Sequence, residues 1–201
     1  MTDLVLVRHG ETVWHAENRY AGLSDIALTP RGIEQAATLA AWARGAGLTA
    51  VWSSTLGRAR RTAEATGLGV RLDERLRELD FGQGDGLTAA EMRERFPEAR
   101  AAFEADPVAH HLPGGEDPRE AAERFVACLR DITAAHPGGR VLVVAHTTAI
   151  RLALCALLGV PLKDYRRTFP NLRNCAITEI RLEAGHTAFL QYNSPISWSS
   201  S

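Results

Sequence analysis

The sequence of 201 residues has few cysteines, no long apolar run and no excess of charge of either sign. Its three cysteines, Cys128, Cys155 and Cys175, form no C-x-x-C pair, and two of them lie within apolar helical patterns, which predicts reduced thiols packed in a core. The longest apolar runs fall far short of a membrane span, and no charged segment followed by a long apolar stretch opens the chain. We therefore expect a cytoplasmic protein that makes no contact with a membrane.

The charge balance argues against nucleic acid as a partner. The formal net charge is -1 and the isoelectric point is near 6.7, so the chain lacks the overall basic surface that binds phosphate backbones. Any anion must be held locally, by a few side chains. With 45% hydrophobic residues the chain can bury a full core, and we expect one domain over residues 1–201. The sequence leaves open whether the chain forms a homo-oligomer.

Short β-branched apolar runs alternate with helical patterns along most of the chain. Residues 4–7 and 141–145 indicate strands buried on both faces of a parallel sheet. Helical patterns begin after Thr29-Pro30, near residue 56, at Asp117-Pro118 and at residue 149, and further strands are expected at 50–52, 176–182 and 187–191. The order predicts an α/β fold of three layers, α/β/α, in which helices cover both faces of a mostly parallel central sheet.

One segment, residues 84–115, interrupts this alternation. It contains a short helix capped by Thr88 and Glu91, followed by mixed polar residues, so we expect an inserted lid and not a second domain. Earlier in the chain, Ser54 or Thr55 is the expected N-cap of the helix that begins near residue 56.

Two histidines directly follow predicted strands. His9 follows the first strand, and His146 follows the run VLVVA. Ligands of open α/β sheets bind outside the carboxyl ends of the strands, and neighbouring parallel strands would bring both imidazoles to the same edge. Either histidine alone is equally well explained as a polar strand end bonded to backbone. Two histidines at equivalent positions favour a shared site.

Two arginines and one glutamate complete the candidate set. Arg8 precedes His9, and Arg58 lies in the first turn of a helix, where backbone N–H groups already favour an anion. Guanidinium groups match phosphate oxygens two at a time. Glu78, taken alone, reads as a surface carboxylate in a loop. Beside the histidines and arginines it would supply a proton donor.

The sequence resembles the histidine phosphatase superfamily, whose members include cofactor-dependent phosphoglycerate mutases, fructose-2,6-bisphosphatases, α-ribazole phosphatases and broad-specificity phosphomonoesterases. Five blocks carry the resemblance, and their order spans most of the chain: VRHGET at 7–12, RYAGLSDIALTPRG at 19–32, SSTLGRARRTA at 53–63, LRELDFG at 76–82 and VLVVAHTTAIR at 141–151. The resemblance implies a phosphoglycerate mutase-like fold.

The resemblance also implies roles for the candidate residues. His9 would be the nucleophile that becomes phosphorylated, and Arg8, Arg58 and His146 would surround the transferred phosphoryl group. Glu78 would protonate the leaving oxygen and then take a proton from the attacking water. We expect neither metal nor cofactor, because arginine and histidine supply the positive charge. A metallohydrolase is the weaker alternative, since the sequence has no H-E-x-x-H or comparable spacing.

Three positions depart from the family pattern. Where asparagine commonly follows the tryptophan of the first block, this chain has His15, with Asn18 three residues later, and either residue is a candidate for phosphate contact. Thr147 stands where glycine commonly follows the second histidine, and Gly22 of the second block is a further candidate for substrate binding. Residues 84–86, Gly-Asp-Gly, replace a frequent Trp-Glu-Gly, so we expect the substrate wall to lose an aromatic side chain.

The chain favours a phosphatase over a mutase. Mutases of this family are typically longer and carry Glu-Arg-His-Tyr-Gly around the acid, whereas residues 78–82 read Glu-Leu-Asp-Phe-Gly. A short chain with a modest lid also leaves a phosphohistidine more open to water. We therefore predict a phosphomonoesterase for a small phosphorylated metabolite, with a phosphoglycerate mutase as the alternative. A non-catalytic phosphoryl-binding module is the hypothesis from another class, which the presence of both His9 and Glu78 disfavours.

The sequence does not identify the substrate. The expected lid holds five basic residues that are candidates for a second anionic group of the substrate, and each of them also reads as solvated surface: Arg93, Arg95, Arg100, His110 and His111.

Overall fold

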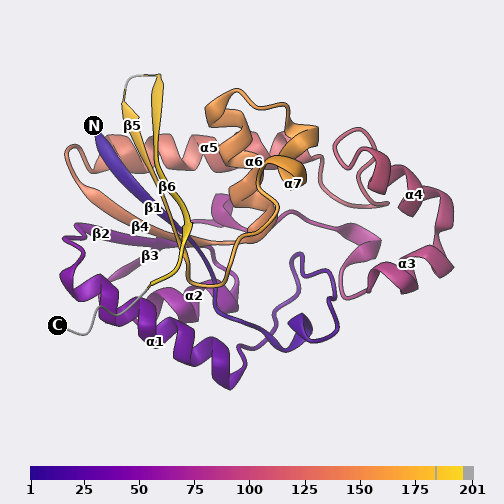
Figure 1. Ribbon diagram of the computed structural model, residues 1–201, viewed down its shortest axis with the longest axis horizontal. Helices are drawn as coiled ribbons and strands as arrows, with labels where there is room; N and C mark the ends of the chain where they lie inside the picture. The colour runs from indigo at the N-terminus through magenta and orange to yellow at the C-terminus, as the bar shows by residue number, and fades with distance from the viewer. Residues whose placement is uncertain (184, 197–201) are drawn as a thin grey trace.

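The computed structural model describes residues 1–183 and 185–196 of the protein. The strands are β1 (Thr2–Arg8), β2 (Ala50–Ser53), β3 (Val70–Leu72), β4 (Arg140–Ala145), β5 (Ile177–Glu183) and β6 (His186–Ser194). The helices are α1 (Pro30–Gly45), α2 (Gly57–Glu64), α3 (Ala89–Arg95), α4 (Pro97–Ala105), α5 (Pro118–Ala135), α6 (Thr147–Leu158) and α7 (Tyr165–Thr168). Figure 1 shows how they are arranged.

The strands of the described residues form one six-stranded sheet in the order β3-β2-β4-β1-β5-β6. The pairs β3·β2, β2·β4 and β4·β1 are parallel, whereas β5 runs antiparallel to β1 and β6 antiparallel to β5. The prediction of a mostly parallel α/β sheet is therefore confirmed. Parallel pairing brings the carboxyl ends of β1, β2 and β4 to one edge of the sheet.

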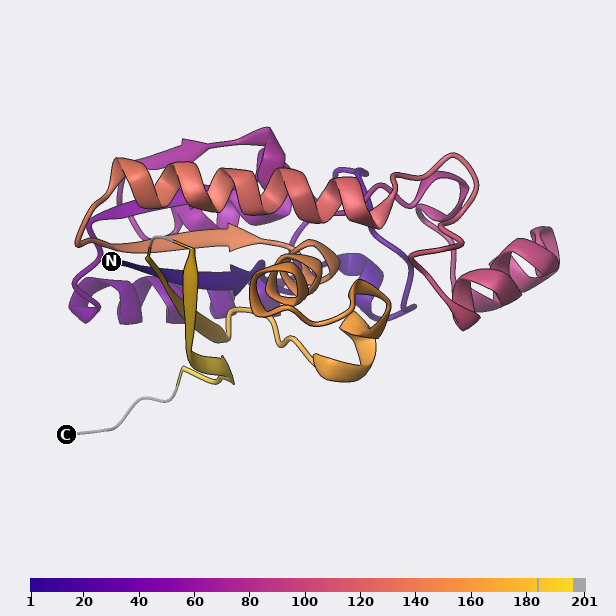
Figure 2. The same cartoon turned by 90° about the horizontal axis from the view of Figure 1, so that it is seen from above.

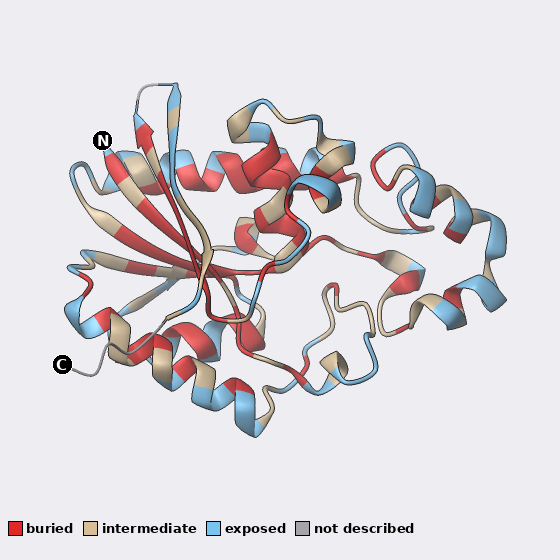
Figure 3. Ribbon diagram, in the orientation of Figure 1, coloured by how far each residue is buried: buried red, intermediate tan, exposed pale blue. Residues whose placement is uncertain are grey.

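Helices cover both faces of this sheet (Figure 1). Because successive side chains of a strand point to opposite faces, Leu4 and Leu6 pack with α5 and α6, while Val5 and Val7 pack with α1 and α2. Figure 3 shows the buried residues concentrated in β1, β4 and the inner sides of these helices. The sheet is thus held rigidly between two apolar layers.

Local sequence explains where α1 begins but not where α2 begins. The Thr29 hydroxyl accepts from the Gly32 N–H at the start of α1, with Pro30 at the first helical position. The expected cap of α2 is wrong, because its N-cap is Leu56 and makes no side-chain bond. The Ser54 hydroxyl instead accepts from the Leu56 N–H and contacts a histidine of the site described below.

The segment between β3 and α5 contains the helices α3 and α4. The capping box of Thr88 and Glu91 at the start of α3 is confirmed, whereas α4 was not predicted. Figures 1 and 2 both place α3 and α4 beyond the carboxyl ends of β1 and β4, away from the sheet. The pattern of burial agrees, because these two helices are largely exposed (Figure 3).

Candidate active site

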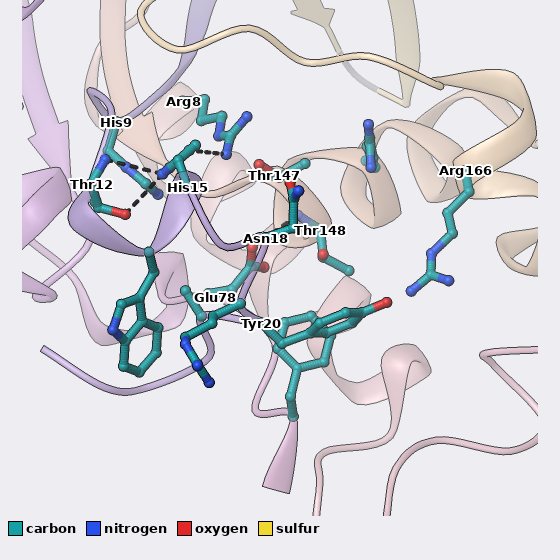
Figure 4. Close-up of a pocket in the computed structure, with 15 residues that line it drawn as sticks. Arg8, His9, Thr12, His15, Asn18, Tyr20, Glu78, Thr147, Thr148 and Arg166 are labelled. Atoms are coloured by element: carbon teal, nitrogen blue, oxygen red, sulfur yellow. Dashed lines mark hydrogen bonds between the residues drawn. The ribbon is translucent and has the colours of Figure 1, made fainter. Parts of the chain in front are cut away.

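A cavity of about 490 Å³ opens at the carboxyl ends of β1 and β4, at the edge of the sheet where the candidate residues were expected. Six of the nine predicted site residues line it: Arg8, His9, His15, Asn18, Glu78 and Thr147 (Figure 4). The other three, Arg58, His146 and Gly22, lie outside its lining.

The register of β1 and β4 explains why two histidines meet. Arg8 is the parallel partner of Ala145, so His9 and His146 follow paired residues at the ends of adjacent strands. Their ring centroids lie 5.2 Å apart. The expectation that parallel strands bring both imidazoles to one edge is confirmed.

His9 is buried and is held in one tautomer. Its Nδ1 lies 2.7 Å from the carbonyl oxygen of Gly10, so Nδ1 carries the proton and Nε2 keeps its lone pair. Burial lowers the pKa of His9 well below its usual value, and the charges of Arg58 and Arg8 lower it further. The imidazole is therefore neutral at pH 7, which is the form that can act as a nucleophile.

Arg8 and His15 form a contact at the wall of the cavity. One terminal nitrogen of Arg8 donates to the carbonyl oxygen of Leu172 at 2.9 Å, and the other lies 2.5 Å from Nε2 of His15. The Nδ1 of His15 lies 2.9 Å from the Thr12 hydroxyl, which fixes the other end of the ring. Burial lowers the pKa of His15 to about 4, with Arg8 as the second cause, so His15 is neutral at pH 7 and adds no second positive charge beside the guanidinium.

Arg58 donates to backbone carbonyls and does not line the cavity. Its guanidinium donates to the carbonyl oxygens of Ser24 and Gly22, both at 2.7 Å, and of Ala21 at 3.3 Å. It is 1% exposed, and burial lowers its pKa. In this position Arg58 orders the loop 21–24 and acts on His9 through its charge. Direct contact with a phosphoryl group stays a prediction.

The loop that Arg58 orders is also held by a carboxylate from residues 84–86. Asp85 accepts from the N–H of Gly22 at 2.9 Å and from the N–H and hydroxyl of Ser24. A Cβ at Gly22 would lie 3.1 Å from the backbone nitrogen of Phe81, so the loop approaches the neighbouring chain closely. Gly22 therefore has a packing role here, and its contact with substrate stays a prediction.

His146 is fully buried behind His9. Its Nε2 lies 2.8 Å from the Ser54 hydroxyl, and its Nδ1 has no hydrogen-bond partner among the described residues. Burial lowers the pKa of His146 well below its usual value, followed by the charges of Arg58 and the nearby His9. Ser54, which the sequence suggested only as a helix cap, is thus a partner of the second histidine.

Glu78 is buried at the N-terminus of α6. Its two carboxylate oxygens accept from the backbone N–H groups of Thr148 and Ala149, at 3.0 and 2.8 Å, and one also accepts from Leu79 at 2.9 Å. These are N–H groups of the first helical turn, which favour an anion. They fix the carboxyl group against the wall of the cavity, where it reaches the same space as His9.

The cavity is lined by several residues that the sequence did not single out. They are Thr12, Trp14, Arg19, Tyr20, Ala21, Phe81, Thr148, Arg151 and Arg166. Trp14, Tyr20 and Phe81 supply aromatic rings to the lining, whereas none of residues 84–86 lines it, so the expected loss of one aromatic side chain at that position stays a prediction. Arg151 could have been found, since it lies one helical turn after Thr147 on α6. Arg166, on the short helix α7, carries no motif that would reveal it.

The five basic residues of the expected lid do not line the cavity. Arg100 is buried instead, where it donates to the Tyr20 hydroxyl and pairs with Glu104 at 2.9 Å. Among the described residues, no group of three or more His, Cys, Asp or Glu side chains is placed to hold a metal ion. In the same part of the chain, no helix is long and apolar enough to cross a membrane.

Comparison with known proteins identifies the family. The model of the histidine phosphatase superfamily (branch 1) matches residues 4–195. The chain belongs to this superfamily. It is 39% identical over 189 residues to a probable phosphoglycerate mutase, GpmB, of Salmonella paratyphi B. This match covers 90% of this chain and 85% of the relative.

Solved structures of the histidine phosphatase superfamily share the fold. YhfR of Bacillus stearothermophilus superposes with a TM-score of 0.91 at 30% identity, covering 98% of this chain and 100% of the other. A mycobacterial glucosyl-3-phosphoglycerate phosphatase gives 0.86 at 29% identity, with 96% and 99% covered. A phosphoserine phosphatase of Entamoeba histolytica, solved with 3-phosphoglyceric acid, gives 0.86 at 28% identity, with 97% and 98% covered. The family and these phosphatases indicate a phosphoric monoester hydrolase.

Proposed function

We propose that the protein is a metal-independent phosphomonoesterase that acts on a small phosphorylated metabolite through a phosphohistidine at His9. The observation that carries the proposal is the state of His9. The imidazole is neutral, its Nδ1 is bonded to the Gly10 carbonyl, and it lines a cavity that also contains Arg8 and Glu78. An aligned nucleophile beside positive charge and a carboxyl group is what phosphoryl transfer requires.

In the first step, Nε2 of His9 attacks phosphorus and the bond from phosphorus to the ester oxygen breaks. Arg8 neutralises charge on the phosphoryl oxygens, and Glu78, which enters this step as the carboxylic acid, gives its proton to the leaving oxygen. In the second step, Glu78 takes a proton from water, the water oxygen attacks phosphorus, and the electron pair of the P–N bond returns to His9. The products are an alcohol and inorganic phosphate, and both His9 and Glu78 regain their starting states.

The remaining predicted residues act around this centre. We infer that His146 supports the phosphoryl group and His9 from behind, with Ser54 orienting its ring. Thr147, at the start of α6, and Asn18, between β1 and α1, both line the cavity and are suited to contact phosphoryl oxygens. Arg58 would reach those oxygens by releasing the carbonyls of the loop 21–24.

Phosphorus NMR in the presence of a chelator tests the proposal. The protein is incubated with a panel of phosphomonoesters that includes 3-phosphoglycerate with a trace of 2,3-bisphosphoglycerate, and His9→Ala is the control variant. Release of inorganic phosphate by the wild type, and none by the folded variant, is the expected result. The absence of turnover of every ester by the wild type would favour a non-catalytic binding module.

A phosphoglycerate mutase is the second candidate, because the curated relatives at 39% identity are named as probable phosphoglycerate mutases. The same experiment separates the two activities. A mutase would convert 3-phosphoglycerate into 2-phosphoglycerate without net release of phosphate, and that result would replace the phosphatase proposal.

A further inference from the structure

The cavity is strongly cationic, and its positive charge exceeds what one phosphoryl group needs. Its lining contains four arginines, at 8, 19, 151 and 166, and a single carboxylate, Glu78. Arg8 lies next to the nucleophile in sequence and supplies charge for the phosphoryl group. The other three arginines therefore need a separate explanation.

One of these three arginines, Arg19, is neutralised by the chain itself, as is Arg100, which lies outside the lining. Arg19 pairs with Glu91 at 2.8 Å and with Glu17, and the buried Arg100 pairs with Glu104 at 2.9 Å. Arg151 and Arg166 differ, because neither makes a salt bridge to any residue that the structure describes. Two cations that face the cavity thus have no carboxylate partner in this part of the chain.

Arg166 packs against two aromatic rings and has no carboxylate partner among the described residues. The guanidinium carbon lies 4.7 Å from the ring centroid of Phe103 and 5.3 Å from that of Tyr165. Contacts with aromatic rings use the face of the guanidinium, while its N–H groups point outward in the plane of the group. In Figure 4 the guanidinium of Arg166 lies on the other side of the drawn residues from His9 and His15, and points toward Tyr20.

Arg151 lies on α6, one turn beyond the residues that hold Glu78. One of its terminal nitrogens donates to the carbonyl oxygen of Pro170 at 2.6 Å, and its Nε is buried without a hydrogen-bond partner among the described residues. Burial lowers its pKa, which reflects the cost of keeping this charge partly out of water. An anion bound in the cavity would offset that cost.

We propose that the substrate carries a second anionic group, a carboxylate or a second phosphate, which is bound by Arg166 with support from Arg151. The inference rests on the proposed function, since the first anionic group is the phosphoryl group at His9. Arg166 then determines specificity, because a guanidinium edge can bind two oxygens of one anion at once. Esters whose leaving group is uncharged would leave Arg166 without a partner.

Binding to the His9→Ala variant tests this proposal separately from turnover. Calorimetry compares two matched pairs, 3-phosphoglycerate with glycerol 3-phosphate, and fructose 1,6-bisphosphate with fructose 6-phosphate. The first pair differs by a carboxylate and the second by a phosphate, so the preferred pair identifies the second anion. We expect the member with two anionic groups to bind about tenfold more tightly in at least one pair, which corresponds to one charge-assisted contact.

The variant Arg166→Gln, in the same background, should lose that preference while binding of the singly anionic ester changes less than about threefold. Arg167→Gln is the matched control, because Arg167 is the exposed neighbour on α7 and does not line the cavity. The inference is overturned if the two esters of each pair bind equally well, or if none of the four esters binds. It is also overturned if Arg166→Gln weakens binding of both members of a pair equally. The absence of turnover by the wild type would instead contradict only the proposed function, since the binding comparison does not depend on catalysis.

Discussion

At the scale of single residues, a substitution of Glu78 can separate proton donation from the structural role of its hydrogen bonds. Its oxygens accept three backbone hydrogen bonds, two of them from the start of α6. Glutamine keeps one oxygen, which can accept the bonds from Leu79 and Ala149, loses the acceptor that faces Thr148, and cannot donate the proton that a poor leaving group needs. We expect Glu78→Gln to lower kcat/KM for an alkyl phosphate by about a hundredfold or more, while kcat/KM for p-nitrophenyl phosphate, whose leaving group needs no proton, is affected far less, because this ratio reports only the steps up to departure of the leaving group. Steady-state kinetics with the two esters decides, and an equal loss for both would assign Glu78 a structural role.

His15 offers a second test at this scale. Its Nε2 lies against Arg8 and its Nδ1 against Thr12, so its ring fixes the guanidinium at the wall of the cavity. Removing it in His15→Ala should raise KM and lower kcat/KM by about tenfold, since a hydrogen bond to a charged group contributes about 1.5 to 3 kcal/mol. His15→Asn retains an acceptor and should recover most of that loss. If both variants match the wild type, His15 does not position Arg8.

Single residues also show what the sequence can and cannot predict about the site. His9 and His146 could be predicted because each ends a strand, and parallel pairing alone brings them together. The partners of Arg58 could not be predicted, because the carbonyls of the loop 21–24 come close to it only in the folded chain and no local sequence pattern indicates that contact. The same holds for Arg166, which comes to the cavity from a four-residue helix late in the chain.

At the scale of elements, the approach of α1 to the loop after β1 depends on glycine. A Cβ at Gly32 would lie 2.1 Å from the carbonyl oxygen of Glu11, and one at Gly10 would lie 2.5 Å from that of Gly32. Gly45, at the other end of α1, would meet nothing within 4 Å. We expect Gly32→Ala to destabilise the protein by about 1 to 3 kcal/mol and to lower activity, because the loop that follows His9 must shift.

The matched variant Gly45→Ala should have the opposite sign and stabilise by up to about 1 kcal/mol, since alanine restricts the unfolded chain and suits a helix. Urea denaturation of the two variants measures both effects. Destabilisation of similar size in both would mean that the contact between Gly32 and Glu11 is not what fixes this junction.

Elements with strong periodic patterns were predicted, and those with weak patterns were not. The helix predicted to begin at Asp117-Pro118 is confirmed as α5, because burial of one helical face leaves a clear period. β3 has three residues, of which two are exposed, so it leaves no clear pattern in the sequence. It forms a strand because it pairs with β2. α4 begins at Pro97, directly after α3, and its position depends on buried side chains such as Phe103 and Arg100.

At the scale of the whole molecule, the site places neutral histidines inside a folded core. The unfolded chain would protonate His9 and His146 near their usual pKa of 6.5, whereas burial keeps both neutral in the folded protein to well below that value. Between these limits the unfolded state binds more protons than the folded state. Stability is therefore full above pH 6.5 and is lost as the pH falls below it, by about 1.4 kcal/mol per pH unit for each of these buried histidines.

Urea denaturation at pH 7, 6 and 5 measures this loss in a window above the usual pKa values of carboxylates, whose protonation destabilises the protein only in more acidic solution. His146→Asn removes one of the histidines whose pKa is lowered on folding, so its stability should fall less steeply with decreasing pH than that of the wild type, whatever its stability at pH 7. The activity of the folded protein should not fall in parallel with its stability between pH 7 and pH 5, because His9 stays neutral and able to attack while the fold weakens. A wild type whose stability is unchanged from pH 7 to pH 5 would show that the buried imidazoles are protonated at pH 5 as readily in the folded protein as in the unfolded chain, and would contradict a lowered pKa at His9.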